Sequence, residues 1–169
     1  MDDIIIGPEQ LAAVFDAHAG ALKLYAAQFS GTPADVVQEA FLDLVRQTTR
    51  PDCTVAWLYR AVRNRAISGI RSAGRRRRHE RSAAMLVETW FLPSEENAVD
   101  GKLATQALQS LPEDQREIVV ARIWGGLSFQ QFAQVAGVSS STAHRRYQSA
   151  LAALRQELGI SWPKENTTT

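Results

Sequence analysis

Apolar residues recur at helical spacing along most of the chain, and no segment alternates apolar and polar residues as a strand would. The pattern indicates an all-α protein. It predicts helices at about 8–29, 33–47, 54–74, 101–110, 112–124, 129–136 and 140–158, with a weaker helical turn at 82–91.

Pro93, followed by the polar residues 94–97, breaks the chain between an N-terminal unit of about four helices and a C-terminal unit. A chain of 169 residues can form one domain or two small ones. The pattern therefore predicts two small helical domains joined by a flexible acidic linker. Their expected bounds are 1–82 for the first domain, 83–100 for the linker, 101–160 for the second domain and 161–169 for a tail.

The segment 33–47 has a clear helix start, with Thr32 as a possible cap and Pro33 in the first helical position. One face is apolar and the other mainly polar. The apolar face consists of Val36, Val37, Ala40, Phe41 and Leu44. The opposite face carries Asp35, Gln38, Glu39, Leu42 and Arg46. Leu42 is large and apolar among polar neighbours, which fits either a docking stripe for a partner helix or an ordinary surface with one stray leucine.

The segment 54–74 begins with an apolar face of Trp57, Leu58, Ala61 and Val62. Ile67 and Ile70 fall out of phase with this face. Either the buried stripe wraps around the helix, or the helix bends near Asn64.

Charge is strongly segregated, although the formal net charge is only +1. Nine arginines lie between Arg60 and Arg81 against one acid, and the next stretch, 85–100, is acidic with no lysine or arginine. This favours a polyanion-binding surface, with a solvated arginine run as the alternative. Trp57 and Tyr59 beside these arginines either stack on bases or fill the core.

The stretch 127–154 carries the signals of a helix-turn-helix. Ser128 and Gln131 have the spacing of a capping box, Gly137 marks a corner, and Ser139 can cap the second helix. The second helix has a predicted buried stripe of Ala143, Tyr147, Ala150, Leu151, Leu154 and Leu158. Its other faces carry Ser141, Thr142, His144, Arg145, Arg146, Gln148 and Ser149. This set contains hydroxyls, an amide and arginines but no acid, which favours DNA reading over a plain helical hairpin.

Other classes of function receive no support from the sequence. Cys53 is the single cysteine and the histidines 18, 79 and 144 are scattered, so we expect no metal site and no cofactor. No nucleophile–base pair or phosphate loop stands out, which argues against an enzyme. No apolar run approaches 18 residues and the start, MDDIIIGPEQ, lacks the basic region of a signal peptide. These features predict a cytoplasmic protein.

Three stretches together resemble a known family. They are DVVQEAFLDL, AWLYRAVRNRAI with the arginines after it, and the long segment from LQSLPEDQREIVV to SALAALR. In this order and spacing the chain, over roughly 11–158, is similar to bacterial RNA polymerase sigma factors of the extracytoplasmic-function (ECF) subgroup.

The resemblance implies a division of labour. The first domain would bind core RNA polymerase and read the −10 element as single-stranded non-template DNA, and the second would read the −35 element as duplex. An anti-sigma factor is a further candidate partner, and the acidic linker resembles segments in the RNA-exit path. The loop 48–55 would border a pocket for a flipped base.

Polymerase binding is expected at Asp35, Gln38, Glu39, Leu42 and Arg46. Contacts to the −10 element are expected from Trp57, Tyr59, Arg60, Arg63, Asn64, Arg71, Arg75, Arg76, Arg77 and Arg78. Contacts to the −35 element are expected from Ser141, Thr142, His144, Arg145, Arg146 and Gln148.

The chain departs from the family pattern at several positions. Ala34 stands where an acid is frequent, Ser68 where Asp or Asn is common, and His144 where a basic residue is usual. The loop before Trp57 is short, and SSST replaces a usual glycine before the threonine. Two alternatives therefore stay open: a stand-alone helix-turn-helix regulator, and a sigma-like adaptor that has lost promoter recognition.

Overall fold

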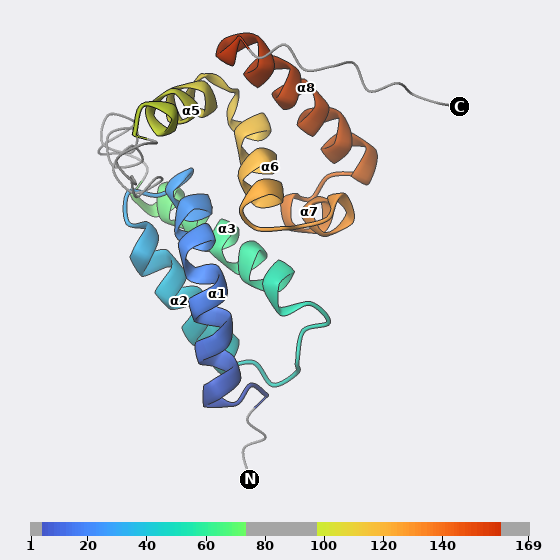
Figure 1. Cartoon of the computed structure of the whole chain (residues 1–169). Coiled ribbons are helices and arrows are strands. Elements are labelled where there is room, and N and C mark those ends of the chain that lie inside the picture. The colour runs from blue at the N-terminus through green and yellow to red at the C-terminus, as the bar shows by residue number, and fades with distance from the viewer. Residues whose placement is uncertain (1–4, 74–97, 160–169) are drawn as a thin grey trace.

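The computed structural model describes residues 5–73 and 98–159, with side chains described for 5–69 and 103–159. Within these ranges every regular element is an α-helix, as the periodicity predicts (Figure 1). The helices are α1 (Pro8–Ala27), α2 (Pro33–Val45), α3 (Thr54–Ala73), α5 (Ala98–Ser110), α6 (Glu113–Ile123), α7 (Phe129–Ala136) and α8 (Ser140–Leu158).

The first three helices pack on one another and form the N-terminal unit. Each contributes large apolar side chains to the shared core, among them Leu22 of α1, Phe41 of α2 and Leu58 of α3. The apolar face predicted for α2 is confirmed: Val37 and Leu44 are buried, and Val36 packs against the core. Burial of this face holds α2 against α1 and α3 and leaves its polar face outward.

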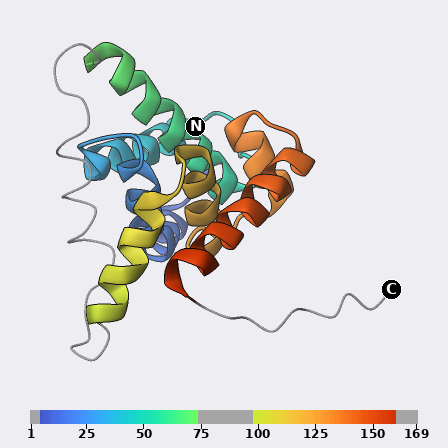
Figure 2. The same ribbon diagram turned by 90° about the horizontal axis from the view of Figure 1, so that it is seen from above.

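The C-terminal unit comprises α5, α6, α7 and α8. Helices α6 and α7 both pack on α8, and α5 lies along α8 beside them (Figure 2). A small core of Leu108, Leu111, Val119 and Ala150 joins α5, α6 and α8. These contacts fix α8 by one side and leave its outward side uncovered.

The two units also pack on each other. Contacts join α3 to α7 and α1 to α6, and the apolar core runs without interruption from Tyr25 and Tyr59 into Ile118 and Phe132 (Figure 1). The sequence predicted two helical domains, and each is present. Their joining through one continuous apolar core was not part of that prediction.

Several local predictions are corrected by the structure. Thr32 occupies the position before α2, but its side chain makes no capping bond; its backbone N–H instead donates to Ser30 Oγ at 3.1 Å. Helix α3 continues without a break past Asn64, so the buried stripe wraps around it. Leu158 is exposed, because α8 extends beyond the helices that cover its other leucines. Helix α5 starts at Ala98, inside the predicted linker.

Some predictions fall outside the described residues. They are the helical turn at 82–91, the break at Pro93, most of the linker and the tail. In the part of the chain that is described, no helix has the length and apolarity needed to cross a bilayer.

Candidate functional site

Local capping signals fix the corner between α7 and α8. Ser128 Oγ accepts from the backbone N–H of Gln131 at 3.1 Å, and Gln131 Oε1 accepts from the N–H of Ser128 at 2.9 Å. Gly137 ends α7 with φ of 69°, a left-handed conformation that favours glycine. Ser139 then caps α8 by accepting from the N–H of Thr142. The predicted capping box, corner and cap are all confirmed.

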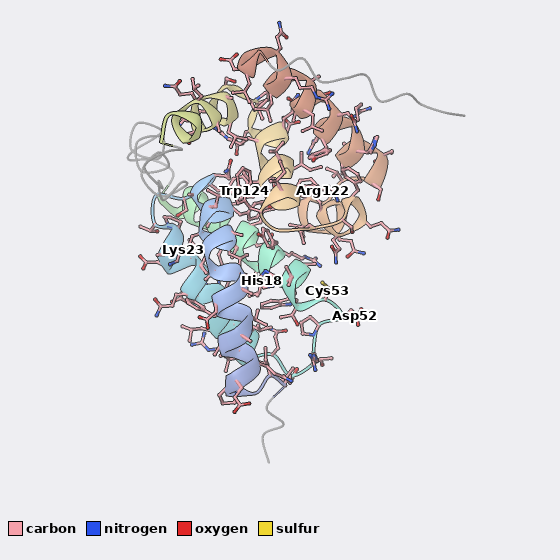
Figure 3. The ribbon with its side chains drawn as sticks, in the orientation of Figure 1. His18, Lys23, Asp52, Cys53, Arg122 and Trp124 are labelled. Atoms are coloured by element: carbon pink, nitrogen blue, oxygen red, sulfur yellow. The ribbon has the colours of Figure 1, made fainter. Side chains whose placement is uncertain are left out.

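A cation of α6 also holds α7 and α8. Arg122 of α6, labelled in Figure 3, donates to the carbonyl of Leu127 at 2.8 Å. Its guanidinium lies 4.1 Å from the ring centre of Phe129 and 5.3 Å from that of Tyr147. Stacking of arginine on aromatic rings adds up to about 2 kcal/mol when water is excluded. Arg122 thus ties α6 to α7 and α8 and sets the angle at which α8 is presented.

The outward side of α8 forms the α8 surface, defined by the six residues expected at the −35 element. Arg145 is exposed and points away from the buried stripe. His144 is exposed but rests edge-on against Phe129, with ring centres 5.0 Å apart. Arg146 is half-buried and pairs with Asp114 of α6 at 3.2 Å. The remaining members are Ser141, Thr142 and Gln148. The structure therefore gathers all six on one helix, and among the residues it describes no ion pair is formed by Arg145.

The outward side of α2 forms the α2 surface: Asp35, Gln38, Glu39, Leu42 and Arg46, all exposed. Leu42 has 40% of its surface exposed, which is high for a leucine in the middle of a packed helix. Arg65 of α3 contacts Glu39 at 3.6 Å, and its Nε and Nη2 both contact one oxygen of Asp43, Oδ2. This pairing anchors the acidic edge of the surface to α3.

The residues predicted on α3 divide into an open and a covered group. Arg60 and Asn64 are exposed, and Trp57 is half-buried against the core. Tyr59 has no exposed surface, and its ring lies 4.9 Å from that of Tyr25. The sequence left both rings open between base stacking and the core, and the fully buried one is Tyr59. Arg71 and Arg75–Arg78 lie outside the described side chains.

Arg63 is held by a carboxylate of the C-terminal unit. Glu117 Oε1 accepts from Arg63 Nε at 2.7 Å and from the Tyr25 hydroxyl at 2.6 Å. Only 4% of the Glu117 side chain and 24% of the Arg63 side chain are exposed. We call Tyr25, Arg63 and Glu117 the Glu117 cluster. Both partners of this carboxylate come from the N-terminal unit, so the cluster exists only while the units touch.

Titration of the cluster follows from its burial. Desolvation raises the pKa of Tyr25 well above its ordinary value, and the adjacent Glu117 charge raises it further. Burial disfavours the Arg63 charge, but the hydrogen bond and charge of Glu117 outweigh this and raise the pKa of Arg63. Tyr25 is therefore a protonated donor and Arg63 a cation at any physiological pH.

Two more contacts join the units beside the cluster. Gln131 of α7 donates to Cys53 Sγ at 3.3 Å, at the start of α3, where Cys53 lies in Figure 3. Gly125 lies so close to Tyr59 that a Cβ built there would be 2.5 Å from the phenol oxygen. Next to these contacts, an open cavity of about 420 Å³ is lined by Arg63, Glu117 and Arg146 among others.

Sequence reasoning missed the residues that join the units. Glu117 is the clearest case, because it lies on α6 four residues before the buried Ala121, within a run of buried apolar residues. A carboxylate on an apolar helix face indicates a buried partner. The signal was present, but nothing in the chain order points to Tyr25 and Arg63, which lie 92 and 54 residues away.

Two helical units, the second a helix-turn-helix with a free polar face, define a DNA-binding protein with a separate helical module. Comparison with known proteins makes this specific. Residues 14–76 match the Sigma-70 region 2 family, and residues 102–154 match the Sigma-70, region 4 family. The chain is 32% identical over 164 residues to the ECF RNA polymerase sigma factor SigL of Mycobacterium tuberculosis, covering 89% of this chain and 92% of that protein.

Solved structures agree with this fold. The sigma factor RpoE, in complex with the anti-sigma factor NepR from Bartonella quintana, superposes with a TM-score of 0.68 at 22% identity over 91% of this chain and 97% of that one. CnrH, in complex with the cytosolic domain of CnrY, gives 0.59 at 25% identity over 90% of both chains.

The chain belongs to the ECF family of RNA polymerase sigma factors. It is a sigma factor, with core RNA polymerase and promoter DNA as its partners, and it directs promoter-specific transcription initiation. The family is not an enzymatic one.

Proposed function

We propose that the three surfaces divide the work of this sigma factor, with the α2 surface docking on core RNA polymerase. The observation that carries the assignment is the exposure of Leu42 in the centre of a polar helix face whose other side is fully packed. Burying a leucine side chain contributes about 1.5–3 kcal/mol, so one such residue is a substantial anchor for a partner helix. Asp35, Gln38, Glu39 and Arg46 surround it and supply polar contacts at the rim.

The α8 surface is assigned to the −35 duplex. An α-helix fits the major groove, and arginine, serine and amide side chains match the acceptors and donors on base edges. Support comes from the cap at Ser139 and the corner at Gly137, which present the first turns of α8 outward. In this assignment Arg145 reads a base, while His144 and Arg146 position the helix on the backbone.

The −10 element is assigned to α3 and the loop 48–55 before it. Exposed Arg60 and Asn64 lie beside the half-buried ring of Trp57. Aromatic stacking contributes about 1–3 kcal/mol per base, and the neighbouring arginines would hold the phosphates. Tyr59, Arg63, Arg71 and Arg75–Arg78 belong to the same proposed site, although Tyr59 and Arg63 are engaged by the C-terminal unit.

We propose 1–82 and 101–160 as the two units, 83–100 as linker and 161–169 as tail, although α5 begins at Ala98, before the proposed start of the second unit. Together with transcription as its task, these features support a cytoplasmic protein without catalytic activity of its own. An anti-sigma factor remains a proposed partner.

A stand-alone regulator would use the C-terminal unit and leave the α2 surface without a purpose. An adaptor that has lost promoter recognition fits the unusual His144, but it does not need the uncovered α8 surface, whose six residues include no acid. Binding to core polymerase distinguishes the proposal from a stand-alone regulator. Selection of promoters by the bound chain distinguishes it from an adaptor.

The docking assignment is tested by Leu42→Asp. This change should weaken association with core polymerase by at least about tenfold, since it removes the apolar anchor and adds a charge to the contact. Binding is measured by competition of labelled full-length chain for core enzyme, with run-off transcription on templates selected from a randomised promoter pool.

Leu103→Asp is the matched control, because Leu103 of α5 is also exposed, by 51%, and lies in the other unit. It should bind core enzyme as the unchanged chain does. Equal binding by the Leu42 and Leu103 variants would contradict the docking assignment.

A further inference from the structure

The fold brings an acid against the α8 surface, although the six residues of that surface include none. Asp114, in the first turn of α6, pairs with Arg146 of α8, and 3.2 Å separate Asp114 Oδ2 from Arg146 Nε. The exposed fraction of the side chain is 49% for Asp114 and 28% for Arg146. The pair therefore lies at the edge of the surface proposed to meet the −35 duplex, within reach of solvent.

The other two acids in this part of α6 act on other groups. Glu117 is held within the Glu117 cluster. Burial lowers the pKa of Arg116, and the nearby charge of Glu113 opposes that shift. Among the described residues, Asp114 is thus the acid that forms an ion pair with Arg146.

This ion pair is of a kind that DNA can break. Partly exposed pairs contribute little net free energy, because water solvates the separated charges and salt screens them. A DNA phosphate also offers Arg146 a negative charge, and its neutralisation releases counterions that are condensed on the duplex. Asp114 and the DNA backbone therefore compete for the same guanidinium.

The competition leaves the proposed base contact of Arg145 unaffected. Consecutive residues of a helix are rotated by about 100° around its axis, so Arg145 and Arg146 point in different directions. Arg145 is exposed, and the described structure shows no ion pair between it and Asp114. Contacts to phosphates position a protein on DNA but carry no base information. Asp114 can thus weaken the backbone contact of α8 without changing the sequence that α8 prefers.

We propose that Asp114 limits the affinity of this sigma factor for −35 DNA by holding Arg146 away from the phosphate backbone. The inference rests on the assignment of the α8 surface to the −35 duplex in the proposed function. Asp114 is a positioning residue, because it acts through Arg146 and does not itself contact DNA. Its effect is to reduce the sequence-independent part of binding, so that base contacts supply a larger share of the affinity.

Asp114→Asn tests the competition, since it removes the charge and keeps the size of the side chain. Holoenzyme with this variant should bind duplex fragments that carry the −35 element about threefold or more tightly. The slope of log affinity against log salt concentration should become steeper by about one, because one phosphate contact is added. Preference among base pairs should not change. The fragments are those that the unchanged holoenzyme selects from a randomised pool.

Glu113→Gln is the matched control, because it removes a negative charge one residue away in the same first turn of α6. It should alter neither the affinity nor the salt slope. Equal gains from Asp114→Asn and Glu113→Gln would overturn the inference, as would an Asp114 variant with unchanged affinity and slope.

Arg146→Gln shows whether Asp114 acts through Arg146. Added to Asp114→Asn, it should abolish both the gain in affinity and the added slope, since the two residues act as one coupled pair. If the gain persists in the double variant, Asp114 is a general repulsive charge and the inference is wrong.

Failure of the proposed function would give a different result. If the unchanged holoenzyme selects no −35 sequence from the pool, the assignment of the α8 surface is contradicted. If selection is retained but Asp114→Asn changes neither affinity nor salt slope, only the role of Asp114 is overturned.

Discussion

The α8 surface and the side of α3 that faces the C-terminal unit both carry an arginine, but the two arginines differ in exposure. Arg145 of α8 is exposed, whereas Arg63 of α3 is paired with Glu117. Polar side chains surround Arg145, whereas Tyr59 beside Arg63 has no exposed surface. The C-terminal unit therefore covers part of the proposed −10 site on α3 and leaves the proposed −35 site on α8 exposed.

The C-terminal unit covers only part of the length of α3. Arg60 and Asn64 remain exposed, while Arg63 between them turns toward the C-terminal unit. Residues 60 and 64 lie about one turn apart on one side of the helix, whereas residue 63 is rotated about 100° around the axis from residue 64. The C-terminal unit thus covers one flank of the proposed −10 site and leaves the other open.

The largest expected effect comes from the two buried tyrosines. Tyr25→Phe removes a hydrogen bond to a charged, buried carboxylate and should lower the free energy of unfolding by about 1.5–3 kcal/mol. Tyr59→Phe removes a hydroxyl without a described partner and should leave stability unchanged or raise it. Urea unfolding of both variants measures the difference. If both variants lost the same free energy of unfolding, the hydrogen bond between Tyr25 and Glu117 would make no specific contribution to stability.

The next effect concerns the open surface. Arg145→Ala should weaken binding to the −35 duplex by about 1–3 kcal/mol, because it removes a base contact, and it should relax preference at one base pair. Binding is measured with polymerase holoenzyme on fragments selected from a randomised pool. Arg155→Ala, an exposed arginine near the end of the same helix, is the control. Similar weakening by both variants would mean that α8 contributes only general positive charge.

The smallest effect tests how α8 is held. Ser139→Ala removes the cap of α8 and should cost about 1 kcal/mol of stability. Ser149→Ala, on the exposed middle of α8, should cost nothing, since alanine has the higher helix propensity. Thermal unfolding distinguishes them. If Ser149→Ala lowered stability as much as Ser139→Ala, the cap at Ser139 would not be what stabilises α8.

The helix-turn-helix was predictable from the sequence because its signals are local. The capping box of Ser128 with Gln131, the left-handed Gly137 and the cap at Ser139 each act within a few residues, and all are present. The buried face of α2 followed from periodicity for the same reason. Helix ends were less certain, since α1 and α2 each stop two residues before the predicted limit.

Contacts between the units were not predictable in this way. Tyr59 is buried because Tyr25 and Gly125 lie against it, and neither is near it in the chain. Glu117 acquires its role from Tyr25 and Arg63 in another unit. Spacing within one helix shows that Arg63 lies near Asn64, but it cannot show that the Arg63 guanidinium pairs with Glu117, a carboxylate far along the chain.

The close approach at Gly125 has a consequence for descent within the family. A Cβ at this position would be 2.5 Å from both the Tyr59 phenol oxygen and the carbonyl oxygen of Ala121. In a homologue with a larger residue at this position, the two units would have to lie further apart or the end of α6 would have to adopt another conformation. The close packing of the two units at this point therefore requires a residue without a side chain at position 125.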